Sequence, residues 1–268
     1  MKAFGGFVLF SFIIASMPML ASEQKIFKIM PMGDSITCGD SNLGYRGPLY
    51  NMLAAEGYKF MPVGNYGRIV EGQGGVPQMG GAIGSPWVED TGGNGEGYIG
   101  PFPIDFEGHG GFQAGQPAEE IGYTDHMLAQ MIPVDIPRFQ PDIILMHLGT
   151  NDLYGGWTKH GRWSEIDSAN NVLGIIDQIH NIDPNIWILV SEIGEGRDRD
   201  SLVRVSDMIK DGVQARILQG RRIEFIDDMY ENFTETDMAD FVHPNAKGYA
   251  KMAEIWYKHL KKYLDRNM

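Results

Sequence analysis

Cysteine is almost absent from this sequence of 268 residues, since Cys38 is the only one. No disulfide can form within the chain, so packing alone must hold the fold together. Basic residues are also scarce, with 22 Lys and Arg against 35 Asp and Glu, which gives a formal net charge of −13 at pH 7. Such an acidic chain binds polyanions poorly, so neither nucleic acid nor an anionic membrane surface is expected as a partner.

Long hydrophobic runs are missing too, except at the N-terminus. There Lys2 precedes an apolar run over residues 7–20, and Ala21 and Ser22 precede the charged Glu23. This order matches the three regions of a secretory signal peptide. The alternative, a membrane anchor, needs roughly 20 apolar residues, and this run is shorter. We expect residues 1–22 to be removed after Ala21 or Ser22, which leaves a secreted protein, extracellular or periplasmic, without stable membrane insertion.

The remaining residues, 23–268, have the composition of one globular domain, because 43% of the whole sequence is hydrophobic and 21% is charged. Glycine is concentrated in one place, where it makes up eleven of the thirty residues from 71 to 100. We interpret residues 71–103 as an insertion within the domain. Two interpretations of this insertion stay open, a functional loop near the site and a surface excursion without a role.

Short apolar runs alternate with helical patterns along the rest of the chain. Each run is nearly unbroken, as expected for strands that are covered on both faces. The predicted strands are residues 25–31, 60–63, 142–148, 186–193 and 223–226. Apolar residues at helical spacing occur at 49–53, 166–176 and 249–260. The alternation predicts an α/β fold, a three-layer α/β/α sandwich around a parallel five-stranded sheet.

Polar motifs follow three of these predicted strands. They are Gly33-Asp34-Ser35 after the first, Gly149-Thr150-Asn151-Asp152 after the third, and Asp240-Phe241-Val242-His243 after the fifth. In open α/β sheets, ligands bind beyond the carboxyl ends of the strands. The three motifs are therefore expected to meet at one edge of the sheet.

These motifs contain the residue types needed for nucleophilic catalysis. A serine hydroxyl needs an imidazole to take its proton and a carboxylate to orient that imidazole, and Ser35, His243 and Asp240 supply all three. The backbone N–H of Ser35 and the side-chain amide of Asn151 are candidate donors to an oxyanion. The alternatives are structural: Gly-Asp-Ser is also typical of a turn or helix cap, and Asn245 after His243 predicts the cap of a final helix.

Four blocks in this order resemble those of SGNH (GDSL-like) hydrolases: Gly33-Asp34-Ser35, the glycine-rich segment 107–112, Gly149-Thr150-Asn151-Asp152, and Asp240-x-x-His243. The resemblance implies a flavodoxin-like sandwich without a metal or organic cofactor. It implies Ser35 as nucleophile, His243 as base, Asp240 as its orienting acid, and Ser35, Gly111 and Asn151 as oxyanion donors. Asp34 and Asp152 are expected to brace the loops that carry Ser35 and Asn151.

Further segments, residues 29–37, 44–46, 107–112 and 243–249, are similar to secreted carbohydrate esterases that remove acetyl groups from xylan and related polysaccharides. The resemblance implies hydrolysis of an acetylated polysaccharide or a small ester through an acyl-enzyme. The insertion departs from this pattern and leaves the polysaccharide open. Two alternatives remain, a lipase, lysophospholipase or thioesterase that acts on longer acyl chains, and a carbohydrate-binding protein without catalytic activity.

Overall fold

The computed structural model of the protein describes residues 25–39, 43–64, 107–109, 111–115, 127–156, 161–194 and 196–267. The predicted signal peptide, residues 1–22, and the glycine-rich insertion predicted at 71–103 lie outside the described residues. Within these described ranges, no helix has both the length and the apolar character needed to cross a membrane.

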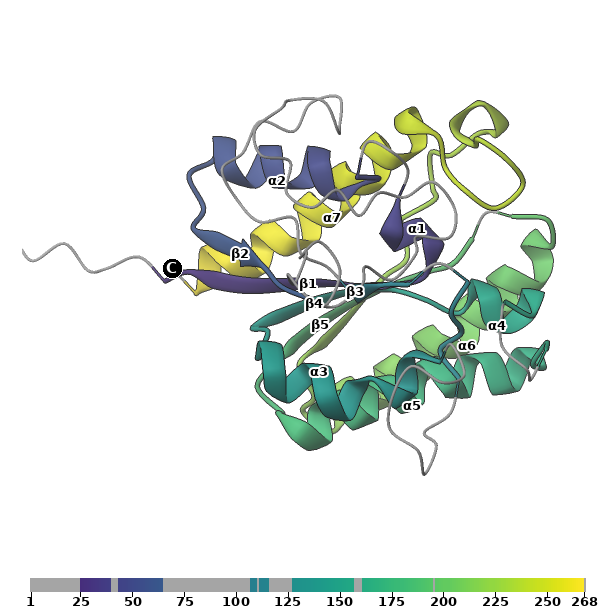
Figure 1. The fold of residues 1–268 in the computed structure, drawn as a ribbon, viewed down its shortest axis with the longest axis horizontal. Helices are drawn as coiled ribbons and strands as arrows, with labels where there is room; N and C mark the ends of the chain where they lie inside the picture. The colour runs from purple at the N-terminus through teal and green to yellow at the C-terminus, as the bar shows by residue number, and fades with distance from the viewer. Residues whose placement is uncertain are drawn as a thin grey trace, which may run out of the picture.

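A parallel sheet forms the centre of the molecule (Figure 1). Its strands run in the order β2 (Phe60–Pro62), β1 (Phe27–Gly33), β4 (Ile143–His147), β5 (Trp187–Ser191) and β6 (Ile223–Ile226). A sixth, very short strand, β3 (Glu107–Gly108), pairs in parallel with the last residues of β1, beyond the residues that pair with β2. All five β4 residues are buried, which explains its unbroken apolar run. The predicted five-stranded parallel sheet is confirmed.

Helices cover both faces of this sheet and complete the predicted three-layer sandwich. On one face lie α2 (Arg46–Ala55) and α7 (Ala246–Arg266), and on the other lie α3 (Ile132–Phe139), α5 (Glu165–Ile182) and α6 (Arg199–Leu218) (Figure 1). The short helices α1 (Ser35–Cys38) and α4 (Thr150–Tyr154) lie at the edge where the strands end. Two 3-10 helices span Leu128–Gln130 and Glu235–Asp237.

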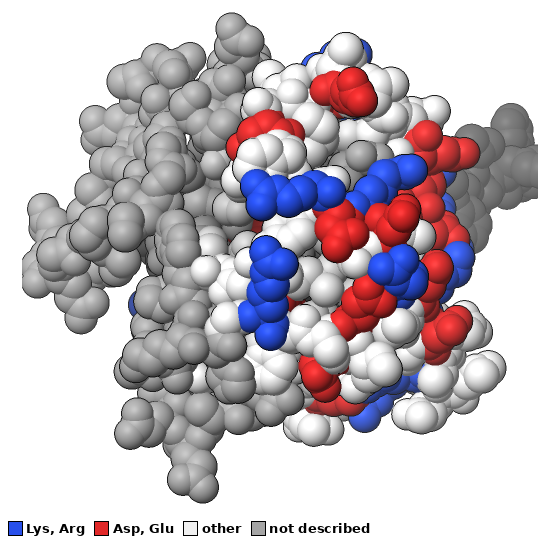
Figure 2. Space-filling view, turned by 90° about the vertical axis from the view of Figure 1, so that its right-hand side faces the viewer, with Lys and Arg blue, Asp and Glu red and all other residues white. Residues whose placement is uncertain are grey.

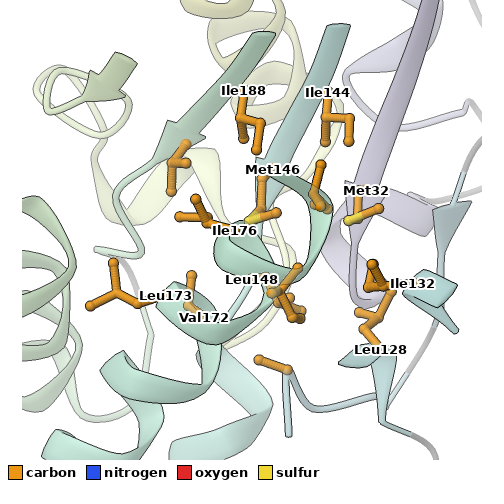
Figure 3. Close-up of a cluster of buried hydrophobic side chains, with 14 of the residues drawn as sticks. Met32, Leu128, Ile132, Ile144, Met146, Leu148, Val172, Leu173, Ile176 and Ile188 are labelled. Carbon is orange, nitrogen blue, oxygen red and sulfur yellow. The ribbon is translucent and has the colours of Figure 1, made fainter. Parts of the chain in front are cut away.

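Each face of the sheet has its own hydrophobic core. In one core, side chains of the sheet meet those of α5, of the 3-10 helix Leu128–Gln130 and of the start of α3. The labelled residues in Figure 3 are Met32, Ile144, Met146, Leu148, Ile188, Val172, Leu173, Ile176, Leu128 and Ile132. The opposite core is built around Trp256 of α7, which is fully buried against α2 and the sheet. Because the layers on both sides are tightly filled, the loops at the strand ends are held on a rigid base.

One predicted helical face is partly wrong. Ile166 begins the predicted helical pattern of residues 166–176, whose apolar side chains should share one buried face, but Ile166 is 62% exposed. The buried face is centred on Val172 and Ile179, both fully buried. At 100° per residue, Ile166 lies more than a quarter turn away from that centre. The other expected residues of this face, including Ala169 and Ile176, are buried.

Candidate active site

Ser35 lies where β1 turns sharply into α1. The carboxylate of Asp34 caps this helix, since Oδ1 accepts a hydrogen bond of 2.9 Å from the backbone N of Ile36. The turn needs glycine at position 33, because a Cβ there would stand 2.2 Å from the carbonyl oxygen of His147 and 2.4 Å from Oγ1 of Thr37. The turn thus brings the Ser35 hydroxyl to the carboxyl edge of the sheet, partly open to solvent.

The Ser35 hydroxyl is the first member of a chain of hydrogen bonds. Its Oγ lies 2.8 Å from Nε2 of His243, and Nδ1 of His243 lies 2.9 Å from Oδ2 of Asp240. The structure therefore brings together three residues that are far apart in sequence and were predicted to meet. A hydroxyl, an imidazole and a carboxylate in this order can turn the hydroxyl into a nucleophile, because the imidazole accepts its proton.

The loop that carries His243 is fixed by its own backbone. Oδ1 of Asp240 accepts hydrogen bonds of 2.7 Å from the backbone N of Val242 and of His243, while Oδ2 faces the imidazole. Asn245 then caps α7 by accepting from the backbone N of Lys247, as its position in the sequence predicts. The structural interpretation of this segment is therefore correct, and it coexists with the hydrogen bond to Ser35.

Gly111 and Asn151 lie next to each other. A Cβ placed on Gly156 would stand 2.5 Å from the carbonyl oxygen of Gly111 and 3.3 Å from Cβ of Asn151. Nδ2 of Asn151 donates to the carbonyl oxygen of Phe112 at 2.9 Å, which uses one of its two hydrogens and orients the other. Gly111 has a φ of 74°, a left-handed conformation that favours glycine.

Asp152 fastens the Gly111 segment to α4. Its carboxylate accepts hydrogen bonds from the backbone N of Ala114 at 2.7 Å and of Gly115 at 3.2 Å, and from Nδ2 of Asn171 at 2.9 Å. The backbone N of His109 donates to the carbonyl oxygen of Gly33 at 2.9 Å. The segment with Gly111 is therefore tied at one end to the strand that leads to Ser35, and at the other to the helix that carries Asn151.

Gln113 completes this arrangement and was not among the residues predicted for the site. The side chain is fully buried. Its Nε2 donates to the carbonyl oxygens of Asn151 at 3.1 Å and Gly161 at 2.6 Å, and its Oε1 accepts from Nε1 of Trp163 at 2.9 Å. A glutamine beside the glycine-rich block was the only available signal, because its partners are distant in sequence.

Tyr45 and Arg46 contact the residues of α1 that follow Ser35. Arg46 is buried and donates from Nη2 to the carbonyl oxygen of Cys38 at 2.8 Å. The hydroxyl of Tyr45 lies 3.3 Å from Oγ1 of Thr37. Burial lowers the pKa of the Arg46 guanidinium. Both residues belong to segment 44–46, one of the segments similar to carbohydrate esterases, and their contacts explain why this segment accompanies the Ser35 motif.

Asp34 and Asp152 are both buried carboxyl groups close to the hydrogen-bonded chain. Burial raises the pKa of Asp34 to about 6, while the hydrogen bond from Ile36 and the nearby His243 oppose the rise and Asp152 adds to it. Burial likewise raises the pKa of Asp152 to about 6, against the hydrogen bonds from Asn171, Ala114 and Gly115. Oδ2 of Asp34 has no hydrogen-bond partner among the described residues, so the charged form is poorly compensated there.

The raised pKa of Asp34 predicts a pH-dependent stability. The Asp34 carboxyl binds its proton more tightly in the folded protein than in the unfolded chain. Protonation of Asp34 therefore stabilises the fold, and this contribution is complete well below pH 3.8 and is lost as the pH rises through 6. A shift of about two pKa units corresponds to about 3 kcal/mol. Asp34→Asn keeps the capping oxygen and cannot ionise. We therefore expect its stability relative to wild type to be about 2 kcal/mol greater at pH 8 than at pH 4, where part of the effect is already lost.

Urea unfolding of both proteins at the two pH values measures this difference. Asp183→Asn is the matched control, because Oδ1 of Asp183 also accepts from a backbone N two residues on, that of Asn185, but at the surface. An Asp34→Asn variant whose stability relative to wild type is the same at pH 4 and pH 8 would contradict the account of a buried, poorly compensated carboxylate.

A metal site is not evident in the described ranges: they contain no group of three or more His, Cys, Asp and Glu placed to hold a metal ion.

Charged side chains of both signs are interspersed on the side of the molecule where α1 and α4 lie (Figure 2). Figure 2 views it from the side where α1 and α4 lie in Figure 1, and it shows Lys and Arg next to Asp and Glu over the described surface.

Comparisons with known proteins relate this chain to lipases, acylhydrolases and esterases. Residues 100–251 match the model of the GDSL-like lipase/acylhydrolase family. The matched region includes Gly111, Asn151, Asp240 and His243 and begins after Ser35. Among solved structures, a family 3 carbohydrate esterase of Clostridium thermocellum superposes with a TM-score of 0.64 at 25% identity, covering 90% of this chain and 98% of that one.

Two curated relatives match over only part of their own length. A multidomain esterase of Ruminococcus flavefaciens is 26% identical in an alignment 262 residues long, which covers 94% of this chain and 31% of the relative. A putative endoglucanase X of Acetivibrio thermocellus is 27% identical over 121 residues, 44% of this chain and 50% of the relative. The chain thus spans a third to a half of the length of these relatives.

Proposed function

Since the chain belongs to the GDSL-like lipase/acylhydrolase family, we propose that it is a secreted serine esterase that hydrolyses acetyl esters of a polysaccharide such as xylan. The observation that carries this proposal is the chain of hydrogen bonds from Oγ of Ser35 through the imidazole of His243 to Asp240, with distances of 2.8 and 2.9 Å. It lies at the carboxyl edge of a parallel sheet, where ligands of such folds bind.

In the proposed reaction, Oγ of Ser35 attacks the carbonyl carbon of the ester while Nε2 of His243 takes the hydroxyl proton. The carbonyl oxygen becomes an oxyanion that accepts hydrogen bonds from the backbone N–H of Ser35 and Gly111 and from the second hydrogen of the Asn151 amide. His243 then gives its proton to the departing sugar hydroxyl as the C–O bond breaks. An acetyl group remains on Ser35.

Water completes the proposed cycle. His243 takes a proton from a water molecule, whose oxygen attacks the acetyl carbon. The second tetrahedral intermediate breaks down to acetate as His243 returns this proton to Oγ of Ser35, which frees the serine. Asp240 remains ionised throughout and stabilises the imidazolium. Burial raises the pKa of Asp240, but hydrogen bonds from the backbone and side chain of His243 outweigh it and lower the pKa below its ordinary value.

The choice of an acetylated polysaccharide rests on the relatives. The carbohydrate esterase of Clostridium thermocellum matches over nearly its whole length, and the Ruminococcus flavefaciens relative is also an esterase. Secretion, proposed from residues 1–22, would bring the enzyme to polysaccharides outside the cell. The negative charge of the chain is compatible with an uncharged polymer.

Hydrolysis of p-nitrophenyl esters of increasing acyl length, beside acetate release from acetylated xylan, tests the proposal. We expect kcat/KM for the acetate to exceed that for the decanoate about 100-fold, because a pocket shaped for acetate excludes long acyl groups sterically. Faster hydrolysis of the decanoate would favour a lipase or thioesterase. Absence of hydrolysis of every ester, with binding to xylan retained, would favour a carbohydrate-binding protein.

A further inference from the structure

An exposed aromatic ring lies between two residues of the proposed active site. Phe241 follows Asp240 directly and precedes His243 by two residues, and the residue is 58% exposed. Every other Phe, Tyr or Trp in the described part of the chain is buried or partly buried. An isolated apolar surface residue needs no explanation, so its immediate surroundings must decide whether Phe241 has a function.

Arg197 lies against this ring. Its guanidinium carbon is 4.3 Å from the centre of the Phe241 ring, within the range of a cation–π contact. Arg197 forms no salt bridge with any described residue, although the chain has an excess of acidic side chains. The guanidinium therefore keeps most of its five donors for other partners, and more than half of the Phe241 residue surface remains accessible beside it.

Phe241 and Arg197 are held in place by the same contacts that build the site. The hydrogen bonds from Val242 and His243 to Asp240 fix the loop that carries Phe241. Gly196, next to Arg197, packs so closely that a Cβ on it would stand 2.6 Å from the hydroxyl of Tyr154 and 3.4 Å from the carbonyl oxygen of Phe241. The backbone that carries the exposed Phe241 ring and Arg197 is therefore held in place by these contacts.

The Tyr154 hydroxyl connects this surface to α4. It accepts a hydrogen bond of 3.1 Å from the backbone N of Asp198. Tyr154 is the last residue of α4, the helix that carries Asn151. Residues 196–198 thus contact both α4, which carries the proposed oxyanion donor Asn151, and the loop that carries the proposed base His243. Arg197 therefore lies beside the ester that these groups would hold.

We propose that Phe241 and Arg197 form a subsite for the sugar ring of the ester substrate. The apolar face of a pyranose stacks on the ring of Phe241, and its hydroxyl oxygens accept hydrogen bonds from the guanidinium of Arg197. Two residues of chain span at most about 7 Å, so Phe241 is close enough to His243 for one substrate to contact both. This inference rests on the proposed esterase function and names the part of the substrate that the acyl site does not contact.

Two esters with the same acyl group test the subsite. For an acetylated xylooligosaccharide and for p-nitrophenyl acetate, kcat/KM is measured and the ratio of the two values is compared among variants. We expect the ratio to fall about tenfold in Phe241→Ala and about fivefold in Arg197→Gln, with recovery in Phe241→Trp, because stacking and hydrogen bonds to the sugar are lost only with the first ester. Arg222→Gln, an exposed arginine at the opposite edge of the sheet, is the matched control and keeps the wild-type ratio.

The outcomes separate this inference from the proposed function. If wild type hydrolyses p-nitrophenyl acetate but the ratio stays within twofold of wild type in both variants, the subsite is refuted and the esterase stands. If wild type hydrolyses neither ester, the proposed function fails and the subsite fails with it. If Phe241→Ala loses both activities, binding of the deacetylated oligosaccharide to Ser35→Ala with and without Phe241→Ala decides: a tenfold weaker affinity supports the subsite, and an unchanged affinity refutes it.

Discussion

Replacing Ser35 by alanine is expected to lower kcat for p-nitrophenyl acetate by about 1,000,000-fold, the order of loss found when the nucleophile of a catalytic triad is removed. In the structure, Oγ of Ser35 is the only atom of that side chain that can attack the ester, and Nε2 of His243 stands 2.8 Å from it. Alanine fits the same turn and leaves the Asp34 cap in place. The loss should therefore appear in kcat, measured by a stopped or continuous assay. The circular dichroism spectrum should match that of wild type, because the folded structure is unchanged.

Ser168→Ala is the matched control for this variant. Ser168 is buried on α5, and its Oγ has no hydrogen-bond partner in the part of the chain that the structure describes. Removing that hydroxyl should leave both activity and stability close to wild type. A Ser35→Ala protein that is folded and retains more than a tenth of the wild-type kcat would remove Ser35 from the mechanism.

Replacing Asp240 by asparagine should cost about 1,000-fold to 10,000-fold in kcat at pH 7. The Asp240 carboxylate accepts a hydrogen bond from Nδ1 of His243, which leaves Nε2 free to accept the proton of Ser35. An amide in that place can donate to Nδ1 instead, and the proton would then sit on Nε2, where it blocks the transfer. Because the new side chain keeps an oxygen for the backbone N of Val242 and His243, the loop should stay folded.

The Asp240→Asn loss is measured as kcat and KM over pH 5 to 9, beside Asp183→Asn, which retains the wild-type values. We expect KM to change little, since the acyl and sugar contacts remain. An Asp240→Asn variant with kcat within tenfold of wild type would mean that the orientation of His243 does not depend on this carboxylate, and the assigned role of Asp240 would be wrong.

Much of the fold was predictable because its signals are local. All five predicted strands occur within a few residues of their predicted bounds, since runs such as residues 143–146 are apolar throughout and lie under helices on both faces. Helices α3 and α6 were not predicted. Along α6 the buried Leu202, Val205, Ile209 and Val213 recur at helical spacing, but charged residues separate them and dilute the pattern. In α3, Pro137 lies within the helix and argues against one in the sequence.

The site was predictable at the level of motifs and less so at the level of contacts. The strand ends bring Ser35, Asn151 and His243 to one edge, because parallel strands place their following loops together. The supporting contacts depend on pairs that the sequence does not mark. Gln113 bonds to Gly161 and Trp163, 48 and 50 residues away, and such partners follow only from the folded arrangement. The contact of Arg197 with Phe241 is of the same kind.

The most direct test of a serine esterase centred on Ser35 is covalent trapping with a fluorophosphonate, read by mass spectrometry of the intact protein and of its peptides. If Ser35 is the nucleophile, we expect one phosphonyl group per chain on the peptide that contains Ser35, loss of ester hydrolysis in proportion to labelling, and no labelling of Ser35→Ala. Labelling at another residue, or ester hydrolysis that persists after Ser35 is fully labelled, would contradict this role of Ser35.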